Sequence, residues 1–112
     1  MQIVEVGGPS RSVAKEAFGL VETRGLVGAI EAADAMCKTA KVRLVRYEVT
    51  TEALVTVAVR GPVAEVEAAV EQGAVAAARV GQVLAKHVIP APDLQMESSL
   101  AAPGKVGAPR MD

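Results

Sequence analysis

The chain has 112 residues, which suits one domain, and a domain of this size leaves a large share of its surface in water unless it associates with other copies. Its 12 basic and 13 acidic residues nearly balance, so no basic surface for nucleic acid is implied. No apolar run reaches the roughly 18–20 residues of a membrane-spanning helix, so no membrane is expected as a partner. The lone cysteine, Cys37, cannot form an intrachain disulfide, which suits a reducing cytoplasm.

The first fourteen residues form a segment of their own. Gly7 and Gly8, followed by Pro9, interrupt the apolar run that begins at Ile3. We therefore expect residues 1–14 to be an N-terminal extension, present either as a short strand or as a loose tail.

The next segment predicts a strand followed by a helix. Residues 17–23 read as the strand, and Gly25 ends it. Apolar residues at spacings of three and four predict a helix over 26–40. The buried stripe of that helix is expected to be Leu26, Ile30, Ala33 and Cys37. A thiol on such a stripe is expected to be buried and inert.

Two strands come next, over 42–49 and 54–59, and the segment between them is short enough for a hairpin. In the first strand, alternation predicts one face with Val42, Leu44 and Arg46 and another with Arg43, Val45 and Tyr47.

A helix and a strand follow. Pro62, at the first helical position, starts a helix that runs to about Val80, and Gly81 ends it. The last strand is expected over 83–89, with Pro90 after it.

The predicted order is βαββαβ. It indicates an α+β fold of the ferredoxin-like or split βαβ type, an antiparallel sheet with two helices on one face. A short C-terminal helix over 94–100 is expected to complete a domain of residues 15–100, and residues 101–112, rich in Pro and Gly, are expected to form a flexible tail. The fold class alone does not determine a function.

The stretch from Gly19 to Met36 resembles the opening strand and first helix of hexameric shell proteins of bacterial microcompartments. Residues 55–61, 73–81 and 87–90 resemble later elements of that family, so the similarity covers about 17–92. The resemblance implies a structural protein and not an enzyme, without a cofactor or metal. It implies a homohexamer in the bacterial cytoplasm that tiles with other shell proteins around encapsulated enzymes and passes small metabolites through a central pore.

Two positions match the family's edge between hexamers. Lys38 matches a lysine whose apolar stem lies along its counterpart in the next hexamer and whose ammonium reaches backbone carbonyls. The alternative is that Lys38 only solvates the helix. The family's supporting arginine is replaced by Ala91, which predicts weaker tiling because a methyl group cannot replace a guanidinium.

The hairpin segment occupies the position of the family's pore loop, which is usually a Gly-small-Gly turn preceded by Lys. Its residues here are Thr50, Thr51, Glu52 and Ala53, with Val49 at the lysine position. Both glycines are therefore replaced, and Glu52 stands at the pore-lining position. Six copies of Glu52 would make an acidic pore that favours cations. The alternative is that Glu52 points away and solvates a tight turn.

A second class of function is a small-ligand sensor of ferredoxin-like fold, in which Thr50, Thr51 and Glu52 bind a small cation or amine at a subunit cleft. An enzyme is disfavoured because no nucleophile–base pair is evident. His87 has no metal-binding partner at a suitable spacing, which favours a framework role.

Overall fold

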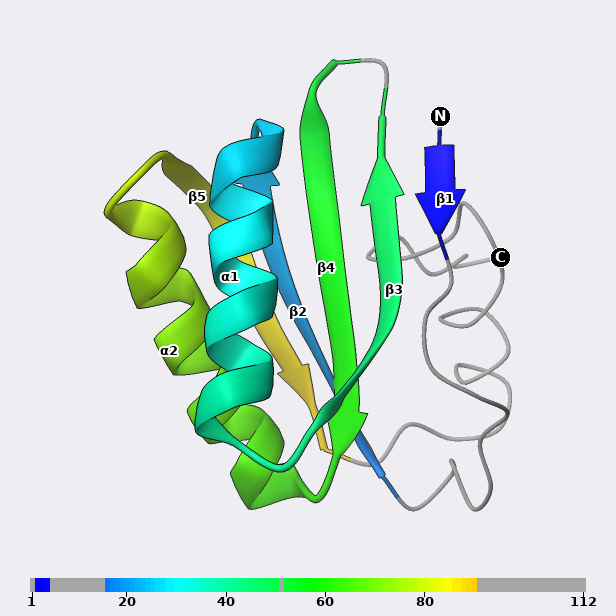
Figure 1. The fold of residues 1–112 in the computed structure, drawn as a ribbon. Helices are drawn as coiled ribbons and strands as arrows, with labels where there is room; N and C mark the ends of the chain where they lie inside the picture. The colour runs from blue at the N-terminus through cyan, green and yellow to red at the C-terminus, as the bar shows by residue number, and fades with distance from the viewer. Residues whose placement is uncertain (1, 5–15, 51, 91–112) are drawn as a thin grey trace.

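The computed structural model describes residues 2–4, 16–50 and 52–90, and Figure 1 shows their arrangement. The elements in chain order are β1 (Gln2–Val4), β2 (Ala17–Arg24), α1 (Leu26–Thr39), β3 (Arg43–Val49), β4 (Leu54–Gly61), α2 (Val63–Ala78) and β5 (Gln82–Ile89). From β2 onward this is the predicted βαββαβ order, so the α+β fold class is confirmed. The predicted C-terminal helix and tail, and Ala91, lie outside the described residues.

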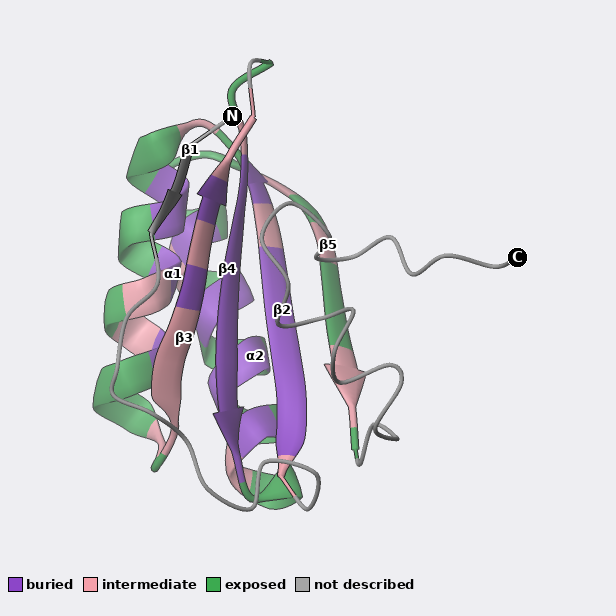
Figure 2. Ribbon diagram, turned by 90° about the vertical axis from the view of Figure 1, so that its right-hand side faces the viewer, coloured by how far each residue is buried: buried purple, intermediate pink, exposed green. Residues whose placement is uncertain are grey.

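The strands form one antiparallel sheet in the order β1-β3-β4-β2-β5. Both helices cover the same face of this sheet, and Figure 2 views the face that they leave uncovered. The extension contributes β1, whose residues pair with Tyr47–Val49 at the outer edge of β3. Of the two forms expected for residues 1–14, residues 2–4 thus adopt the short strand. Within the described part of the chain, no helix is long and apolar enough to cross a membrane.

Small residues set the close packing between the helices and the sheet. A Cβ added at Gly19 would lie 2.6 Å from the side chains of Val66 and Val70, so the glycine lets α2 rest directly on β2. A Cβ added at Gly73 would lie 2.6 Å from the Met36 side chain and 3.3 Å from the Ala32 carbonyl oxygen, so this glycine lets α2 lie close to α1. This packing explains why the core needs so few large side chains.

The predicted buried stripe of α1 was wrong by one position. The buried residues of α1 are Gly28, Ala29, Ala32 and Met36. Leu26 and Ile30 are 50% and 51% exposed, and Cys37 is exposed as well. The physical reason is that α1 packs closely on the sheet through Gly28, Ala29 and Ala32, so the larger side chains of Leu26 and Ile30 lie on its outer side.

The predicted alternation in β3 was also wrong. The pairing of β3 with β4 shifts register between Leu44 and Arg46, which marks a bulge at Val45. Leu44 and Tyr47 therefore pack against the helix-covered core, whereas Val45 packs with the cluster on the other face. One extra residue in a strand moves all later side chains to the opposite face.

Candidate functional site

The loop between β3 and β4 is closed by its own hydrogen bonds. The Thr50 N–H donates to the Leu54 carbonyl at 2.9 Å, and the Ala53 N–H donates to the Thr50 carbonyl at 3.2 Å. The Thr50 hydroxyl donates to the Leu54 carbonyl at 3.3 Å and accepts the Glu52 N–H at 3.4 Å. The Thr50 side chain thus satisfies backbone groups inside the turn. Thr51 lies outside the described residues.

This loop is also fixed to the turn that starts α1. The Gly25 N–H donates to the Ala53 carbonyl at 2.6 Å, and the Thr23 hydroxyl donates to the Gly25 carbonyl at 3.0 Å. Ala53 has a φ of 63°, in the left-handed region that favours glycine. The loop therefore keeps a glycine-type backbone at Ala53 and bears the strain of a methyl group there.

Replacing Ala53 by glycine should relieve this strain. The left-handed conformation costs a non-glycine residue about 1–2 kcal/mol, and the greater freedom of glycine in the unfolded chain cancels about 0.4–1 kcal/mol of the gain. We expect Ala53→Gly to raise the free energy of unfolding by up to about 1 kcal/mol in urea titrations at fixed protein concentration. Ala68→Gly, on the exposed side of α2, should lower it. A decrease for both variants would contradict the strain at Ala53.

Glu52 is the charged residue of the loop and is exposed. No ion pair joins it to another of the described residues. The loop lies at the end of the molecule where α1 begins (Figure 1). Glu52 is therefore placed to present its charge at that end, and both readings of its role, pore lining and turn solvation, agree with its exposure.

Lys38 lies in the last turn of α1, at the opposite end of that helix from the 50–53 loop (Figure 1). Its side chain is 73% exposed, and its Nζ lies 3.1 Å from an Asp34 carboxylate oxygen. Such an exposed pair, four residues apart on a helix, contributes little to stability and breaks readily. The ammonium is thus available to another partner.

Cys37 departs from its predicted environment. It is exposed, although the thiol itself is partly desolvated. This burial raises the pKa of the Cys37 thiol, a hydrogen bond with the Leu44 backbone opposes the shift, and the charge of Asp34 reinforces it. The predicted burial of Cys37 is therefore wrong, because the residue lies on the exposed side of α1, and its predicted inertness stays a prediction.

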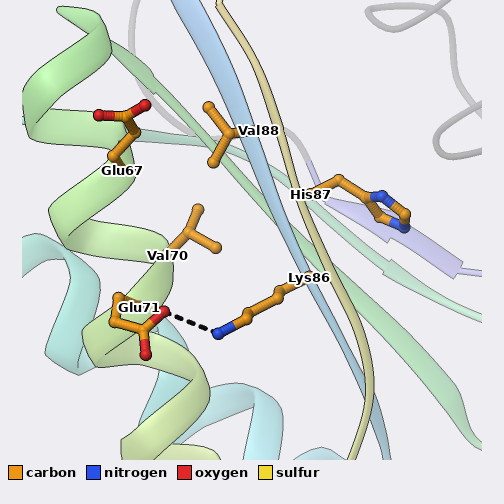
Figure 3. A pocket seen from close by; sticks show the side chains of 6 residues that line it. All are labelled: Glu67, Val70, Glu71, Lys86, His87 and Val88. Atoms are coloured by element: carbon orange, nitrogen blue, oxygen red, sulfur yellow. Dashed lines mark hydrogen bonds and ion pairs between the residues drawn. The ribbon is translucent and has the colours of Figure 1, made fainter.

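The groove between α2 and β5 has a volume of about 260 Å³ (Figure 3). Within it the Lys86 ammonium pairs with the Glu71 carboxylate at 2.7 Å, and Glu67 lies on the same side. The imidazole of His87 points away from α2, to the other side of β5. Among the described residues, no three His, Cys, Asp or Glu side chains come together as metal ligands.

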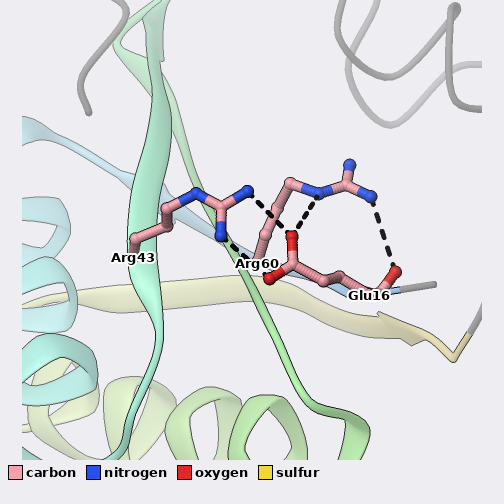
Figure 4. A network of polar contacts seen from close by, with 3 residues as sticks. All are labelled: Glu16, Arg43 and Arg60. Atoms are coloured by element: carbon pink, nitrogen blue, oxygen red, sulfur yellow. Dashed lines mark hydrogen bonds and ion pairs between the residues drawn. The ribbon is translucent and has the colours of Figure 1, made fainter. Parts of the chain in front are cut away.

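An ion-pair cluster that the sequence did not predict lies at the end of the sheet opposite the 50–53 loop (Figure 4). Arg43 donates two hydrogen bonds, of 2.9 and 2.8 Å, to the two carboxylate oxygens of Glu16. The Arg60 Nε lies 3.8 Å from the same carboxylate, and the Arg60 guanidinium lies 5.3 Å from the ring centre of Phe18. The cluster depends on the strand register, in which Arg43 pairs with Arg60 and Ala17 pairs with Gly61. The sequence alone does not give this register.

The cluster predicts acid-sensitive stability. The hydrogen bonds from Arg43 lower the pKa of Glu16, more than the opposing effect of burial raises it. A lowered folded pKa gives stability that is present above the unfolded pKa and is lost as the pH falls through the folded value. Glu16 is 25% exposed, so water screens its charge only in part. We therefore expect Glu16→Gln to lower the free energy of unfolding by about 1–2 kcal/mol near pH 7 and by much less near pH 3.

Urea unfolding at both pH values, at one protein concentration, measures this difference. The matched control is Glu71→Gln, which removes the carboxylate of an equally short but more exposed pair with Lys86. It should change the free energy of unfolding by less than about 1 kcal/mol at either pH. Equal losses for the two variants would show that the Glu16 cluster has no special weight.

Together, the fold and the site define a small α+β protein with a hairpin loop at one end, an exposed lysine at the other and no metal-binding cluster among the described residues. Residues 17–92 match the family described as BMC domain, and the chain belongs to this family. It is a structural shell protein of a bacterial microcompartment and not an enzyme. Its place is the microcompartment shell in the bacterial cytoplasm, where it assembles with other shell proteins.

Curated relatives show how similar the chain is to known shell proteins. It is 57% identical over 86 residues to the bacterial microcompartment shell protein PduA of Citrobacter freundii, covering 77% of this chain and 92% of the relative. It is 50% identical to EutM of Escherichia coli, over 73% and 84% of the two chains, and 54% identical to the carboxysome shell protein CsoS1C of Hydrogenovibrio crunogenus, over 76% and 84%.

A solved structure gives the same result for the fold. A microcompartment protein from Desulfitobacterium hafniense superposes with a TM-score of 0.68 at 34% identity. The comparison covers 77% of this chain and 47% of that one.

Proposed function

We propose that six copies of this chain form a ring whose 50–53 loops surround a central pore, and that rings tile into sheets through Lys38. The pore passes small metabolites to and from encapsulated enzymes. The observation that carries this proposal is the placement of the two candidate sites at opposite ends of one subunit (Figure 1). A ring needs that separation, because one end meets the axis and the other forms the perimeter.

Exposed apolar side chains support the proposal that the loop end of the subunit faces the axis of the ring. Six large ones lie in the first half of α1, the last turns of α2 and the next residues up to the start of β5: Leu26, Val27, Ile30, Val75, Val80 and Leu84. All three regions lie at the same end of the molecule as the loop (Figure 1). Single exposed apolar residues are common, but a group of this kind marks an association surface. Converging subunits would bury them.

The hydrogen bonds of the described loop residues support a role of the loop as a pore lining. Four hydrogen bonds join Thr50, Glu52, Ala53 and Leu54, and a fifth joins Ala53 to Gly25. A loop held in this way presents the same groups from every copy, so a pore built from it would have a defined diameter and charge.

Sedimentation equilibrium, with the chain at concentrations well above and below those used for assembly, tests the ring. We expect a particle of six chains that persists on dilution. A monomer, or a discrete smaller oligomer that binds a small cation or amine saturably, would contradict the ring and favour the sensor instead.

A further inference from the structure

The outer edge of β3 is covered by residues from the same chain. β1 pairs with it antiparallel, in the register Gln2↔Val49, Ile3↔Glu48 and Val4↔Tyr47. β1 lies outside residues 17–92, the segment that matches the family. In the sheet order, β3 would be the edge strand if β1 were removed. An uncovered edge is a template for pairing with another chain.

The charges on β3 fit a second copy of β3. Arg46 and Glu48 flank Tyr47 on β3. Arg46 pairs with Ala58 of β4, which belongs to the cluster on the face without helices. Glu48 pairs with Thr56, two residues away, so it lies on the same face. Arg46 and Glu48 are 2% and 5% exposed. If two β3 edges pair antiparallel about Tyr47, each Arg46 stands opposite the Glu48 of the other copy. Opposite charges in directly facing positions stabilise a strand pair.

Tyr47 lies at the centre of this edge, between Arg46 and Glu48. Its hydroxyl is buried and has no hydrogen-bond partner among the described residues. In a symmetric pair Tyr47 would stand opposite its own counterpart, and facing aromatic residues stabilise a strand pair. The edge is thus complementary to itself in both charge and side-chain type.

The cover itself is short. β1 has three residues, so it makes few ladder hydrogen bonds and loses the backbone freedom of every residue that it orders. We propose that the β3 edge is a docking edge for β3 of a second copy, and that β1 covers this edge until residues 2–4 detach. The proposal rests on the sheet order and the charges of β3, and it is independent of the ring.

Two proline substitutions in the 112-residue chain test whether β1 covers a docking edge. Successive N–H groups of a strand point to opposite edges, so Ile3→Pro with Val4→Pro removes one donor that faces β3. We expect concentration-dependent association, with at least about a two-fold rise in sedimenting mass over the parent. The control, Ser10→Pro with Arg11→Pro, places two prolines outside β1 and should keep the mass of the parent. A double-proline variant that keeps the mass of the parent at all concentrations would overturn the proposal.

Charge variants in the double-proline background identify the surface. Adding Glu48→Arg places two arginines opposite each other and should restore the mass of the parent. Adding both Arg46→Glu and Glu48→Arg exchanges the charges and should restore association. Association that persists with Glu48→Arg alone would place the contact elsewhere and refute the β3 edge.

Hydrogen exchange provides a second measurement in case the charge variants do not fold. In the double-proline variant, amides of residues 46–49 should become more protected as the protein concentration rises. Protection that does not depend on concentration would overturn the proposal.

Discussion

Lys38→Asp should abolish extended sheets while leaving the ring of six subunits intact. The reason is that Lys38 is 73% exposed and lies at the end of α1 remote from the loop, so the change removes a perimeter contact without touching the core. The new carboxylate would also face its counterpart in the next ring, and like charges placed together across an interface cost several kcal/mol. Electron microscopy of negatively stained protein reports the sheets, and sedimentation reports the ring.

The matched control for this prediction is Lys41→Asp. It changes the charge of an exposed lysine by the same amount, three residues further along the chain. We expect it to keep most of the tiling. Equal loss of sheets in both variants would show that bulk charge and not the position of Lys38 governs assembly. Ala91→Arg should act in the opposite direction and promote sheets, because a guanidinium supplies donors that the methyl group lacks.

Glu52→Gln should reduce the preference of the pore for cations by about tenfold at low salt. Six carboxylates around one axis raise the local cation concentration and repel anions. Unit charges about 8 Å apart repel by about 0.5 kcal/mol even in water, and several such pairs act together. The difference in selectivity between the parent ring and the Glu52→Gln ring should therefore shrink as salt screens the charges.

Conductance of rings inserted in a planar bilayer measures this preference at low and high salt. Glu67→Gln is the control, because it neutralises an exposed carboxylate on α2, away from the loop. It should leave the selectivity unchanged. An anion-selective pore, or one indifferent to Glu52→Gln, would show that other groups of the loop line it.

Periodicity and turn residues were sufficient to predict the six elements from β2 to β5, because each element has a clear apolar pattern and a Gly or Pro near its end. They were not sufficient for the outer face of α1. Leu26 and Ile30 are as apolar as core residues, and a sequence pattern does not separate surfaces buried by folding from those buried by association. The stripe was therefore assigned to the wrong surface.

The sites show the same division. The exposure of Lys38 and Glu52 could be predicted, because both are local properties of a helix face and a turn. The cluster of Glu16, Arg43 and Arg60 could not, because it depends on the register of three strands. The bulge at Val45 and the pairing of β1 depend on register in the same way.

A cryo-electron microscopy reconstruction of the particle in solution tests the central claim most directly. We expect a six-fold ring with the 50–53 loops around the axis and Lys38 on the perimeter. A particle of another symmetry, or a ring with Lys38 at the axis and the loops outside, would contradict it.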